Sequence, residues 1–544
     1  MRQTITTGVN KPEAQVDKHI FWPACIIVTA VIIVMIVFES QTLAAIKVAF
    51  EFVTNQLGFA YIWAGAFFFG AVLWLSLGRY SQVRLGGPDA RPEFSRLSWV
   101  TMFFCSGIGT SLIFWSSIEW TYYFTAPPFG LEPKSDRAAD YAAMYGMFHW
   151  GPLAWAFYCL TAFPIGYAFY NRKQKQLRLS IACAGLIGEK HANGHIGKVI
   201  DVLMVFGLVG GVGTALASGT PMLAEAISRL LGIEHTFNVD IVVVLIWSVI
   251  FVTSVVLGLK RGIQRLSQFN LYALSVLCVI IFIGGPTFFM LNSFTNSMGL
   301  MITEFAHMAF YTDPVANSMF PQWWTIFYWA WWVAMGPYMG IFIARISRGR
   351  TFRDMGLTVL GAGSAGCILF FILFGSTSMH AELSGTFPVL ETMANESPSA
   401  AILGTLEQLP LYSVILVLFI VVGFVYSGTT VDSSAYVLAS VTSRNLGEGV
   451  EPHVANRFFW AVALGAAGLV LMNAGGLEPL KTASLVVGVP LLVVMCLSFF
   501  SLLRWLRADF PERQRSSADV GTAEATASAT PSTNESITGV QGYV

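Results

Sequence analysis

The stretch YWAWWVAMGPYMG (Tyr328–Gly340) places three tryptophans within four residues of an apolar segment and follows them with a Gly-Pro pair. An indole N–H in lipid needs a hydrogen-bond partner, and proline removes a backbone hydrogen bond that lipid cannot replace. Both features are costly in a helix that only faces lipid. We therefore expect this stretch to line a buried site and to interrupt its own helix.

The composition of the 544-residue chain is that of an integral membrane protein. It is 55% hydrophobic and only 11% charged, whereas soluble domains carry about 25% charged residues. No small-residue cleavage site follows the first apolar run, so that run is read as a span and not as a signal peptide. Twelve runs reach membrane-spanning length, numbered spans one to twelve: 20–38, 58–77, 98–125, 145–170, 198–228, 238–258, 266–290, 323–345, 356–376, 411–442, 457–474 and 482–503.

The distribution of positive charge predicts the orientation of these spans. If both termini are cytoplasmic, the outward-facing segments hold only five of the 31 Lys and Arg residues. These five are Lys47, Lys134, Arg137, Arg229 and Lys481. The asymmetry supports an even number of spans and a multi-pass protein of the cell (inner) membrane.

The segments outside the spans divide the chain into three parts. Residues 1–18 and 508–544 are polar and are expected to be disordered cytoplasmic tails on either side of a transmembrane domain at 19–507. Residues 296–311 are too polar and too short to span, and we expect an amphipathic helix at the outer surface. The seven cysteines show no CxxC pairing, so neither a disulfide framework nor a metal site is indicated.

Two spans carry residues that weaken a helix. Gly107 and Gly109 lie in span three, and Gly336-Pro337 lies in span eight. If spans three to seven and eight to twelve form two five-helix repeats, these are the first helices of the two repeats. Interrupted spans at matching positions point to a transporter site near mid-membrane. The alternative is that the glycines only allow close helix packing.

Aromatic side chains recur at helical spacing in three spans, which places them on common faces. A single tryptophan near a span end is commonly an interfacial residue. Several rings converging from different helices would form a cage that suits a quaternary ammonium group, since such a cation cannot donate hydrogen bonds. The side chains are Trp115, Glu119 and Tyr122 in span three; Trp150, Trp155 and Tyr158 in span four, with Pro152 between the indoles; and Trp324, Tyr328, Trp331, Trp332 and Met335 in span eight.

Two further sets of polar groups lie within spans. Glu119 could attract a cationic ligand, carry a proton, or accept hydrogen bonds that hold the bent helices. Span ten contains YSGTTVDSS (Tyr426–Ser434), and the hydroxyls of Thr429 and Thr430 could join carbonyls freed near Cys105 and Ile108 in a sodium site. Hydroxyls in spans also commonly bond back to their own helix.

Several short motifs of the chain resemble those of the betaine/carnitine/choline transporter family, and the resemblance covers about residues 18–508. The motifs are FYWAWW, IARISRGR (Ile343–Arg350), FHWGPLAW and the glycine-bearing span three. Within the family, SSIEW, TAPPFGLEP and GEKHANG are most similar to the carnitine/γ-butyrobetaine exchanger branch. The resemblance implies an all-α integral membrane fold of 12 transmembrane helices, with a five-plus-five inverted repeat, two extra N-terminal helices, a surface helix before span eight and a homotrimer.

The resemblance also implies roles for individual residues. The central cage would be Tyr122, Trp150, Trp155, Tyr158 and Trp331 with Trp332 beside it; an outer site would use Trp115, Trp324 and Met339; and sodium would bind Thr429 and Thr430 with span-three carbonyls, near Tyr426. Sodium-independent exchangers carry an arginine in span seven where this chain has Asn270, and they lack Gly107 and Gly109. Of two threonines that form a second sodium site in the family, only Thr214 is matched.

These observations predict a secondary transporter of quaternary-ammonium compounds (carnitine, γ-butyrobetaine, glycine betaine or choline), coupled to Na+ by symport. The alternative is a sodium-independent carnitine/γ-butyrobetaine exchanger. An integral-membrane redox enzyme is a rival of another class, but haem ligation needs paired histidines in spans, and only His149 lies clearly inside one. No enzyme motif, resident cofactor or nucleic-acid partner is expected; the partners would be the substrate and membrane lipid.

Overall fold

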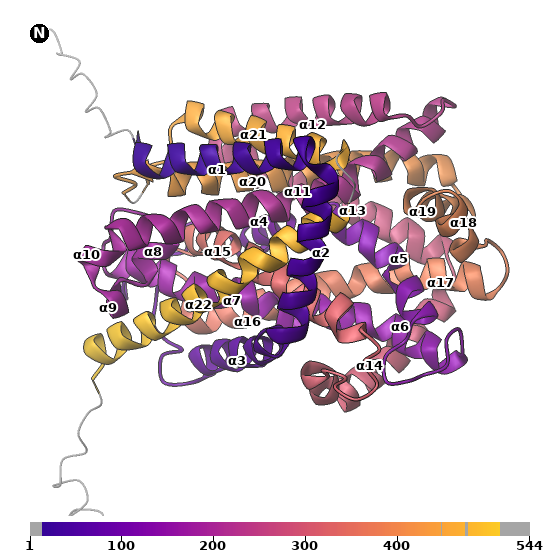
Figure 1. The fold of residues 1–544 in the computed structure, drawn as a ribbon, viewed down its shortest axis with the longest axis horizontal. Helices are drawn as coiled ribbons and strands as arrows, with labels where there is room; N and C mark the ends of the chain where they lie inside the picture. The colour runs from indigo at the N-terminus through magenta and orange to yellow at the C-terminus, as the bar shows by residue number, and fades with distance from the viewer. Residues whose placement is uncertain (1–13, 448, 474–476, 512–544) are drawn as a thin grey trace, which may run out of the picture. The chain divides into compact units, whose positions relative to one another are not determined.

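The computed structural model describes residues 14–447, 449–473 and 477–511, which are built almost wholly from helices (Figure 1). The first half contains β1 (Gln15–Val16), α1 (Lys18–Val37), α2 (Glu39–Gln56), α3 (Gly58–Leu77), α4 (Arg96–Ile108), α5 (Ser111–Thr125), α6 (Asp136–His149), α7 (Pro152–Gly166), the π-helical turn η1 (Tyr167–Asn171), α8 (Leu179–Ala182), α9 (Ala184–Ile187), α10 (Glu189–Ala192), α11 (His195–Leu231), α12 (Phe237–Gly258) and η2 (Leu259–Ile263).

The second half continues in the same manner, and its residues up to Leu502, within the last helix, belong to one compact unit. It contains α13 (Gln264–Gly284), α14 (Thr287–Phe310), η3 (Gln322–Ile326), α15 (Phe327–Ile346), α16 (Phe352–Phe370), η4 (Phe371–Gly375), α17 (Ser376–Leu383), α18 (Val389–Asn395), α19 (Pro398–Glu407), α20 (Tyr412–Val441), β2 (Ser443–Arg444), α21 (Val454–Asn473) and α22 (Leu477–Asp509).

The helices confirm an all-α integral membrane protein. Among the described residues, nine helices are long and apolar enough to cross a membrane, or ten if the bent pair α4 and α5 is one span. Two shorter apolar helices, Lys18–Val34 and Val454–Leu469, coincide with the predicted spans one and eleven. Each of the twelve predicted runs therefore falls on an apolar helix.

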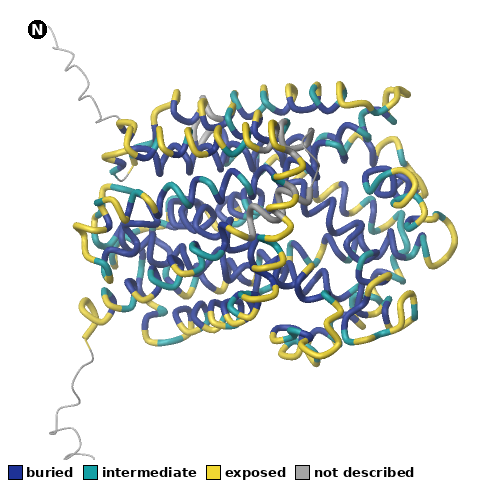
Figure 2. Tube along the Cα trace, in the orientation of Figure 1, coloured by how far each residue is buried: buried dark blue, intermediate teal, exposed yellow. Residues whose placement is uncertain are grey.

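Helix α13 illustrates how burial is arranged in these spans. Its large exposed apolar side chains recur at alternating steps of three and four residues: Phe269, Tyr272, Val276, Val279 and Ile283. The polar side chains of Ser267 and Asn270 are buried instead. This pattern is the inverse of a soluble surface helix, and it marks a face that contacts lipid. Figure 2 shows exposed residues along the outer edges of the bundle and buried residues through its centre.

Span three is broken where the sequence predicts. Helices α4 and α5 meet at an angle of 59°, and Gly109 between them has φ 61° and ψ −159°. This conformation is accessible to glycine because glycine lacks a Cβ. A Cβ at Gly109 would also lie 2.6 Å from the Thr430 hydroxyl oxygen of α20. The break is therefore fixed both by the backbone and by its neighbour.

The predicted interruption of span eight is wrong. Helix α15 runs without a break through Gly336-Pro337, and all of its residues are buried. Pro337 has no N–H to donate to the Val333 carbonyl one turn earlier, and the helix continues across this single missing bond. The hydroxyl of Thr161 on α7 adds a bond between the helices by donating to the Gly336 carbonyl at 2.9 Å. A Cβ at Gly336 would lie 3.2 Å from the Phe157 carbonyl, so this glycine lets α15 pack closely on α7. The irregular part of span eight is instead the π-helical turn η3 that precedes α15.

Other boundaries also differ from the sequence predictions. Helix α14 begins at Thr287, not at residue 296, and span seven already ends at Gly284 of α13 because Gly285 and Pro286 follow. Helix α2 was not predicted, and in Figure 1 it runs across the direction of α1 and α3, which it joins. Helix α22 reaches Asp509, one residue past the predicted start of the C-terminal tail. The predicted tails at 1–13 and 512–544 lie outside the described residues.

The predicted disorder of residues 1–18 is wrong for their last residues. Strand β1 pairs antiparallel with β2, which follows α20. The carboxylate of Asp17 accepts from Arg178 at 3.0 Å and from Arg444 at 2.7 Å. We call these three side chains the N-terminal clamp. Burial alone would raise the pKa of Asp17, but the two arginines outweigh it and lower the pKa to about 2.

Candidate substrate-binding site

The break in span three frees carbonyls that receive hydroxyl donors from three other helices. Carbonyls at the end of a helix have no partner within it. The Ser106 carbonyl accepts from Tyr338 of α15 at 2.9 Å, and the Gly107 carbonyl accepts from Tyr158 of α7 at 3.2 Å. Thr430 of α20 lies 3.5 Å from the Cys105 carbonyl. The break is thus the point at which α7, α15 and α20 all contact α4.

The predicted aromatic residues separate into two clusters. The outer aromatic cluster consists of Trp115 and Tyr122 of α5 and Trp324 of η3. Its ring centroids are 5.1 Å apart for Tyr122 and Trp324, 6.3 Å for Trp115 and Trp324, and 6.4 Å for Trp115 and Tyr122. Tyr122 therefore contacts the predicted outer site, whereas the sequence assigned it to the central cage.

The inner aromatic cluster consists of Trp150, Tyr158, Trp331 and Trp332. Trp150 lies at the junction of α6 and α7, where Pro152 starts α7. Its ring stands edge-on to Trp331 at 5.7 Å and 89°, and to Trp332 at 5.3 Å and 88°. Tyr158 closes the cluster against Trp332 at 4.9 Å and 69°. These perpendicular rings form a corner with aromatic faces on more than one side.

Met339 lies outside the cluster to which it was assigned, and Trp155 lies at the edge of the inner cluster, next to Tyr158. The Trp155 ring stacks on Phe104 of α4 at 6.1 Å and 10°, and Tyr158 is the cage residue with which it has a ring contact. Met339 lies against Gly107, where its methyl carbon would be 2.8 Å from a Cβ. It is fifteen residues, or about 22 Å along the helix, from Trp324. Met339 therefore belongs to the broken region of span three and not to the outer cluster.

Tyr328 links the two clusters, a role that the sequence analysis did not assign. Its ring lies 6.5 Å from Trp115 and 6.4 Å from Trp324 on one side. On the other side it lies 5.8 Å from Trp150 and 6.1 Å from Trp331. The i, i+4, i+7 row of span eight already contained this residue, so the spacing could have pointed to it.

Glu119 is buried and accepts three hydrogen bonds from aromatic residues. The donors are the Tyr123 hydroxyl at 2.5 Å, the Tyr328 hydroxyl at 2.6 Å and the Trp150 indole N–H at 2.9 Å. Both carboxylate oxygens are thereby occupied. Of the three roles left open by the sequence, this geometry favours the one that holds α5, α15 and the α6–α7 junction together.

His149 extends this network to η3. Its Nδ1 lies 2.9 Å from the Tyr123 hydroxyl, and its Nε2 lies 3.0 Å from the Thr325 hydroxyl. Because Tyr123 donates its hydrogen to Glu119, the Nδ1–H of a neutral His149 donates to the Tyr123 oxygen, and Nε2 accepts from Thr325. The His149 carbonyl in turn accepts from the Trp332 indole at 3.2 Å. Tyr123, His149 and Thr325 were not predicted, since their roles depend on contacts between helices.

The predicted sodium ligands lie close to the break but already have partners. Thr429 donates to the Tyr426 carbonyl of its own helix at 2.9 Å. The Ile108 carbonyl accepts from Ser111 at 2.6 Å. Thr430, which lies by the Cys105 carbonyl, is thus the hydroxyl best placed to coordinate an ion together with backbone oxygens. The tyrosine hydroxyl of Tyr426 has no hydrogen-bond partner within the described chain.

Asn270 of α13 lies beside Cys105 of α4, near the break in span three. Its side chain is fully buried, and its amide nitrogen is 3.9 Å from the Cys105 sulfur. The amide oxygen has no hydrogen-bond partner among the described residues. A neutral amide with an unsatisfied oxygen therefore lies beside the broken part of span three.

The family comparison agrees with this arrangement. Residues 19–511 match the family described as BCCT, betaine/carnitine/choline family transporter. The chain belongs to this family. It is therefore a secondary transporter of quaternary-ammonium compounds, a multi-pass membrane protein that binds a small-molecule substrate, and not an enzyme.

Proposed function

We propose that the chain carries a quaternary-ammonium zwitterion, with carnitine, γ-butyrobetaine and glycine betaine as the leading substrates, and that it couples this transport to Na+ by symport. The observation that carries the proposal is the inner aromatic cluster. Trp150 stands at 88–89° to Trp331 and Trp332, so ring faces surround one corner of the protein interior. Such faces attract an onium group without offering it a hydrogen bond.

A second observation supports a substrate that carries a carboxylate as well as the onium group. The Trp331 indole N–H is buried and has no hydrogen-bond partner among the described residues. A ligand carboxylate could accept from this group, which would remove the cost of a buried donor without a partner. A zwitterion is therefore favoured over choline.

Symport is favoured over exchange by the region around the broken span. Thr430 offers a hydroxyl near the Cys105 carbonyl, and oxygen ligands of this kind suit Na+. Asn270 brings no positive charge that could replace the ion. Exchange of carnitine for γ-butyrobetaine is the second candidate, because of the motifs shared with that branch.

The location and assembly of the protein complete the proposal. Its charge distribution favours the cell (inner) membrane with both termini in the cytoplasm. The family resemblance favours a homotrimer.

Uptake of labelled carnitine into proteoliposomes tests the proposal directly. The assay is run with and without an inward sodium gradient, and with or without γ-butyrobetaine inside the vesicles. Symport requires uptake that follows the sodium gradient with empty vesicles. Uptake that needs the internal partner and ignores sodium would establish exchange instead. Glycine betaine and choline, assayed in the same way, rank the substrates.

Two matched pairs of variants connect transport to the proposed site. Trp332→Leu removes a ring of the inner cluster, and we expect substrate binding to fall at least tenfold, because a desolvated cation–π contact contributes about 2 kcal/mol. Trp323→Leu makes the same change at an indole that is 59% exposed, and it should leave binding unchanged. Thr430→Ala should reduce sodium dependence more than Thr429→Ala, since Thr429 bonds to its own helix. Equal loss in each pair would contradict the assignments.

A further inference from the structure

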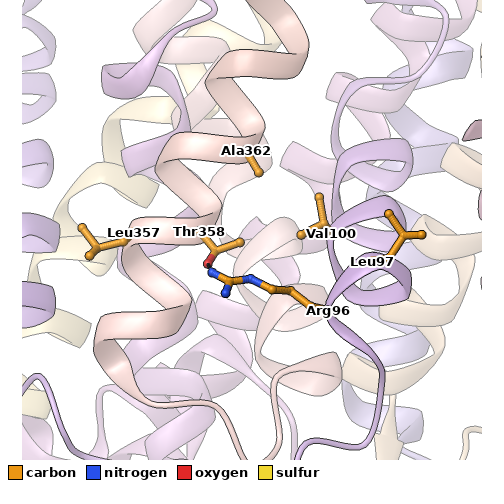
Figure 3. A pocket seen from close by; sticks show the side chains of 6 residues that line it. All are labelled: Arg96, Leu97, Val100, Leu357, Thr358 and Ala362. Carbon is orange, nitrogen blue, oxygen red and sulfur yellow. Dashed lines mark hydrogen bonds between the residues drawn. The ribbon is translucent and has the colours of Figure 1, made fainter. Parts of the chain in front are cut away.

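A groove lies between α4 and α16 (Figure 3), and none of its lining residues belongs to the aromatic clusters. Its volume is about 530 Å3, and its walls are mainly apolar. It is lined by Arg96, Leu97 and Val100 of α4 and by Leu357, Thr358 and Ala362 of α16. Leu97 is 55% exposed and Leu357 is 37% exposed, so the groove opens on the outside of the helix bundle.

Arg96 crosses one end of this groove, as Figure 3 shows. Its guanidinium donates to the Thr358 hydroxyl at 3.0 Å and lies 3.4 Å from the Asp354 carboxylate. Val100 and Ala362 each follow by four residues, about 6 Å deeper along their helices. The groove thus has a cationic end at the start of two predicted spans and an apolar end inside them.

The charge at this end is not balanced by Asp354. Arg350 donates to the same carboxylate at 3.0 Å, so one negative group faces two guanidinium groups. The Arg96 side chain is 69% exposed, which leaves its remaining N–H groups accessible. Arg353, on the same turn of α16, is also exposed. An anion that reaches this point would meet a net positive charge.

We infer that this groove binds one anionic phospholipid, with its phosphate on Arg96 and an acyl chain between α4 and α16. The apolar walls lie at membrane depth, where the only abundant molecule of matching shape is a lipid chain. Basic pockets between transmembrane helices on the cytoplasmic side recognise anionic headgroups. The positive end of the groove complements an anionic lipid and gives no advantage to a zwitterionic one. The inference does not depend on the transported substrate or on the coupling ion.

Native mass spectrometry of the full-length, delipidated protein tests the inference. The first binding constant for phosphatidylglycerol is compared with that for phosphatidylcholine. Arg96→Gln should weaken the first phosphatidylglycerol about fivefold, since one arginine near the membrane surface contributes roughly that factor. It should weaken phosphatidylcholine less, because the choline group offsets the charge of that lipid's phosphate. Arg353→Gln removes the same charge outside the groove and should have a much smaller effect.

A second variant probes the apolar wall without altering charge. Ala362→Phe fills the groove and should also weaken the first phosphatidylglycerol, whereas Arg96→Lys should retain it. The inference is overturned if Arg96→Gln and Arg353→Gln have equal effects, if Ala362→Phe has none, or if the wild type binds both lipids equally. Displacement of the lipid by millimolar glycerol phosphate would also overturn it, because the headgroup alone would then account for binding. Should Arg96→Gln fail to fold, Ala362→Phe alone decides.

Discussion

Glu119 provides the sharpest test of how the aromatic site is organised. If its role is to position Trp150 and Tyr328, both the charge and the reach of the side chain matter. Glu119→Asp keeps the charge but retracts the carboxylate by about 1.5 Å. The Trp150 indole, now at 2.9 Å, would then be about 4.4 Å away, beyond hydrogen-bond distance. Glu119→Gln keeps the reach but replaces one acceptor oxygen with a donor.

The expected magnitudes follow from the three hydrogen bonds to Glu119. In Glu119→Gln, the amide oxygen can still accept from Tyr328 and Trp150, and the amide nitrogen can donate to Tyr123 if His149 changes tautomer. The cost to stability should be about 1–3 kcal/mol. A Trp150 ring that is no longer held must be ordered by the substrate, at about 0.5–1.5 kcal/mol. Substrate binding should therefore weaken by up to about tenfold in Glu119→Asp and by less in Glu119→Gln, which keeps the bond to Trp150.

Quenching of tryptophan fluorescence by glycine betaine and carnitine measures this binding, and thermal melting reports stability. The positioning role requires that Glu119→Asp binds no better than Glu119→Gln. If Glu119 instead attracted the onium group by its charge, Glu119→Asp would bind almost as wild type and Glu119→Gln would bind poorly. That result would refute the reasoning. Equal binding by both variants and wild type would show that the hydrogen bonds do not affect the site.

Three further predictions concern the break and the charged groups outside the spans. Gly109→Ala should abolish uptake and cost at least about 2 kcal/mol of stability, because the φ of Gly109 is 61° and a Cβ there would press on Thr430. The loss of stability should be smaller in Gly107→Ala, because a Cβ there meets the flexible side chain of Met339. Asp17→Asn should lower the melting temperature at pH 7, with a loss of about 2 kcal/mol of stability. Because the pKa of Asp17 is about 2 in the folded protein, its contribution to stability is fully present above about pH 4. In wild type this contribution disappears as the pH falls towards 2. His235 lies 3.1–3.2 Å from two carboxylates, and its hydrogen bonds to them raise its pKa to about 9. Its contribution to stability, about 1–2 kcal/mol, is therefore fully present below pH 6.5 and should be lost as the pH rises through 9. The difference in melting temperature between wild type and His235→Gln should therefore shrink between pH 6 and pH 10, and a constant difference would contradict the pairing.

Features that depend on local sequence could be predicted. The apolar run at 58–77 coincides with α3, and the break at Gly109 follows from a residue that tolerates a left-handed backbone. Whether Pro337 breaks α15 could not be predicted, because the answer depends on how closely α7 packs on α15 at Gly336. Helix α2 carries too little apolar character to be recognised as a span, and its helical spacing alone did not predict it.

The composition of the aromatic site could be predicted better than its arrangement. Helical spacing correctly placed Trp324, Tyr328 and Trp331 on one face of span eight, as their ring contacts show. Spacing cannot show how α5 and α7 are rotated about their axes, and this rotation places Tyr122 in the outer cluster and turns Trp155 towards α4. Contacts between helices, and not positions within one helix, decide which rings share a ligand.

The N-terminal clamp has a consequence for the biosynthesis of the protein. Asp17 and Arg444 are separated by 427 residues, so the ribosome must add all of these residues before the two side chains can meet. At 5–20 residues per second, this interval is about 20–85 s. For most of that time β1 and α1 have been made, while β2, the partner strand of β1, does not yet exist. Pairing of the two strands is therefore a late event in assembly, and it joins the first membrane helix to the chain only after α20 has been made.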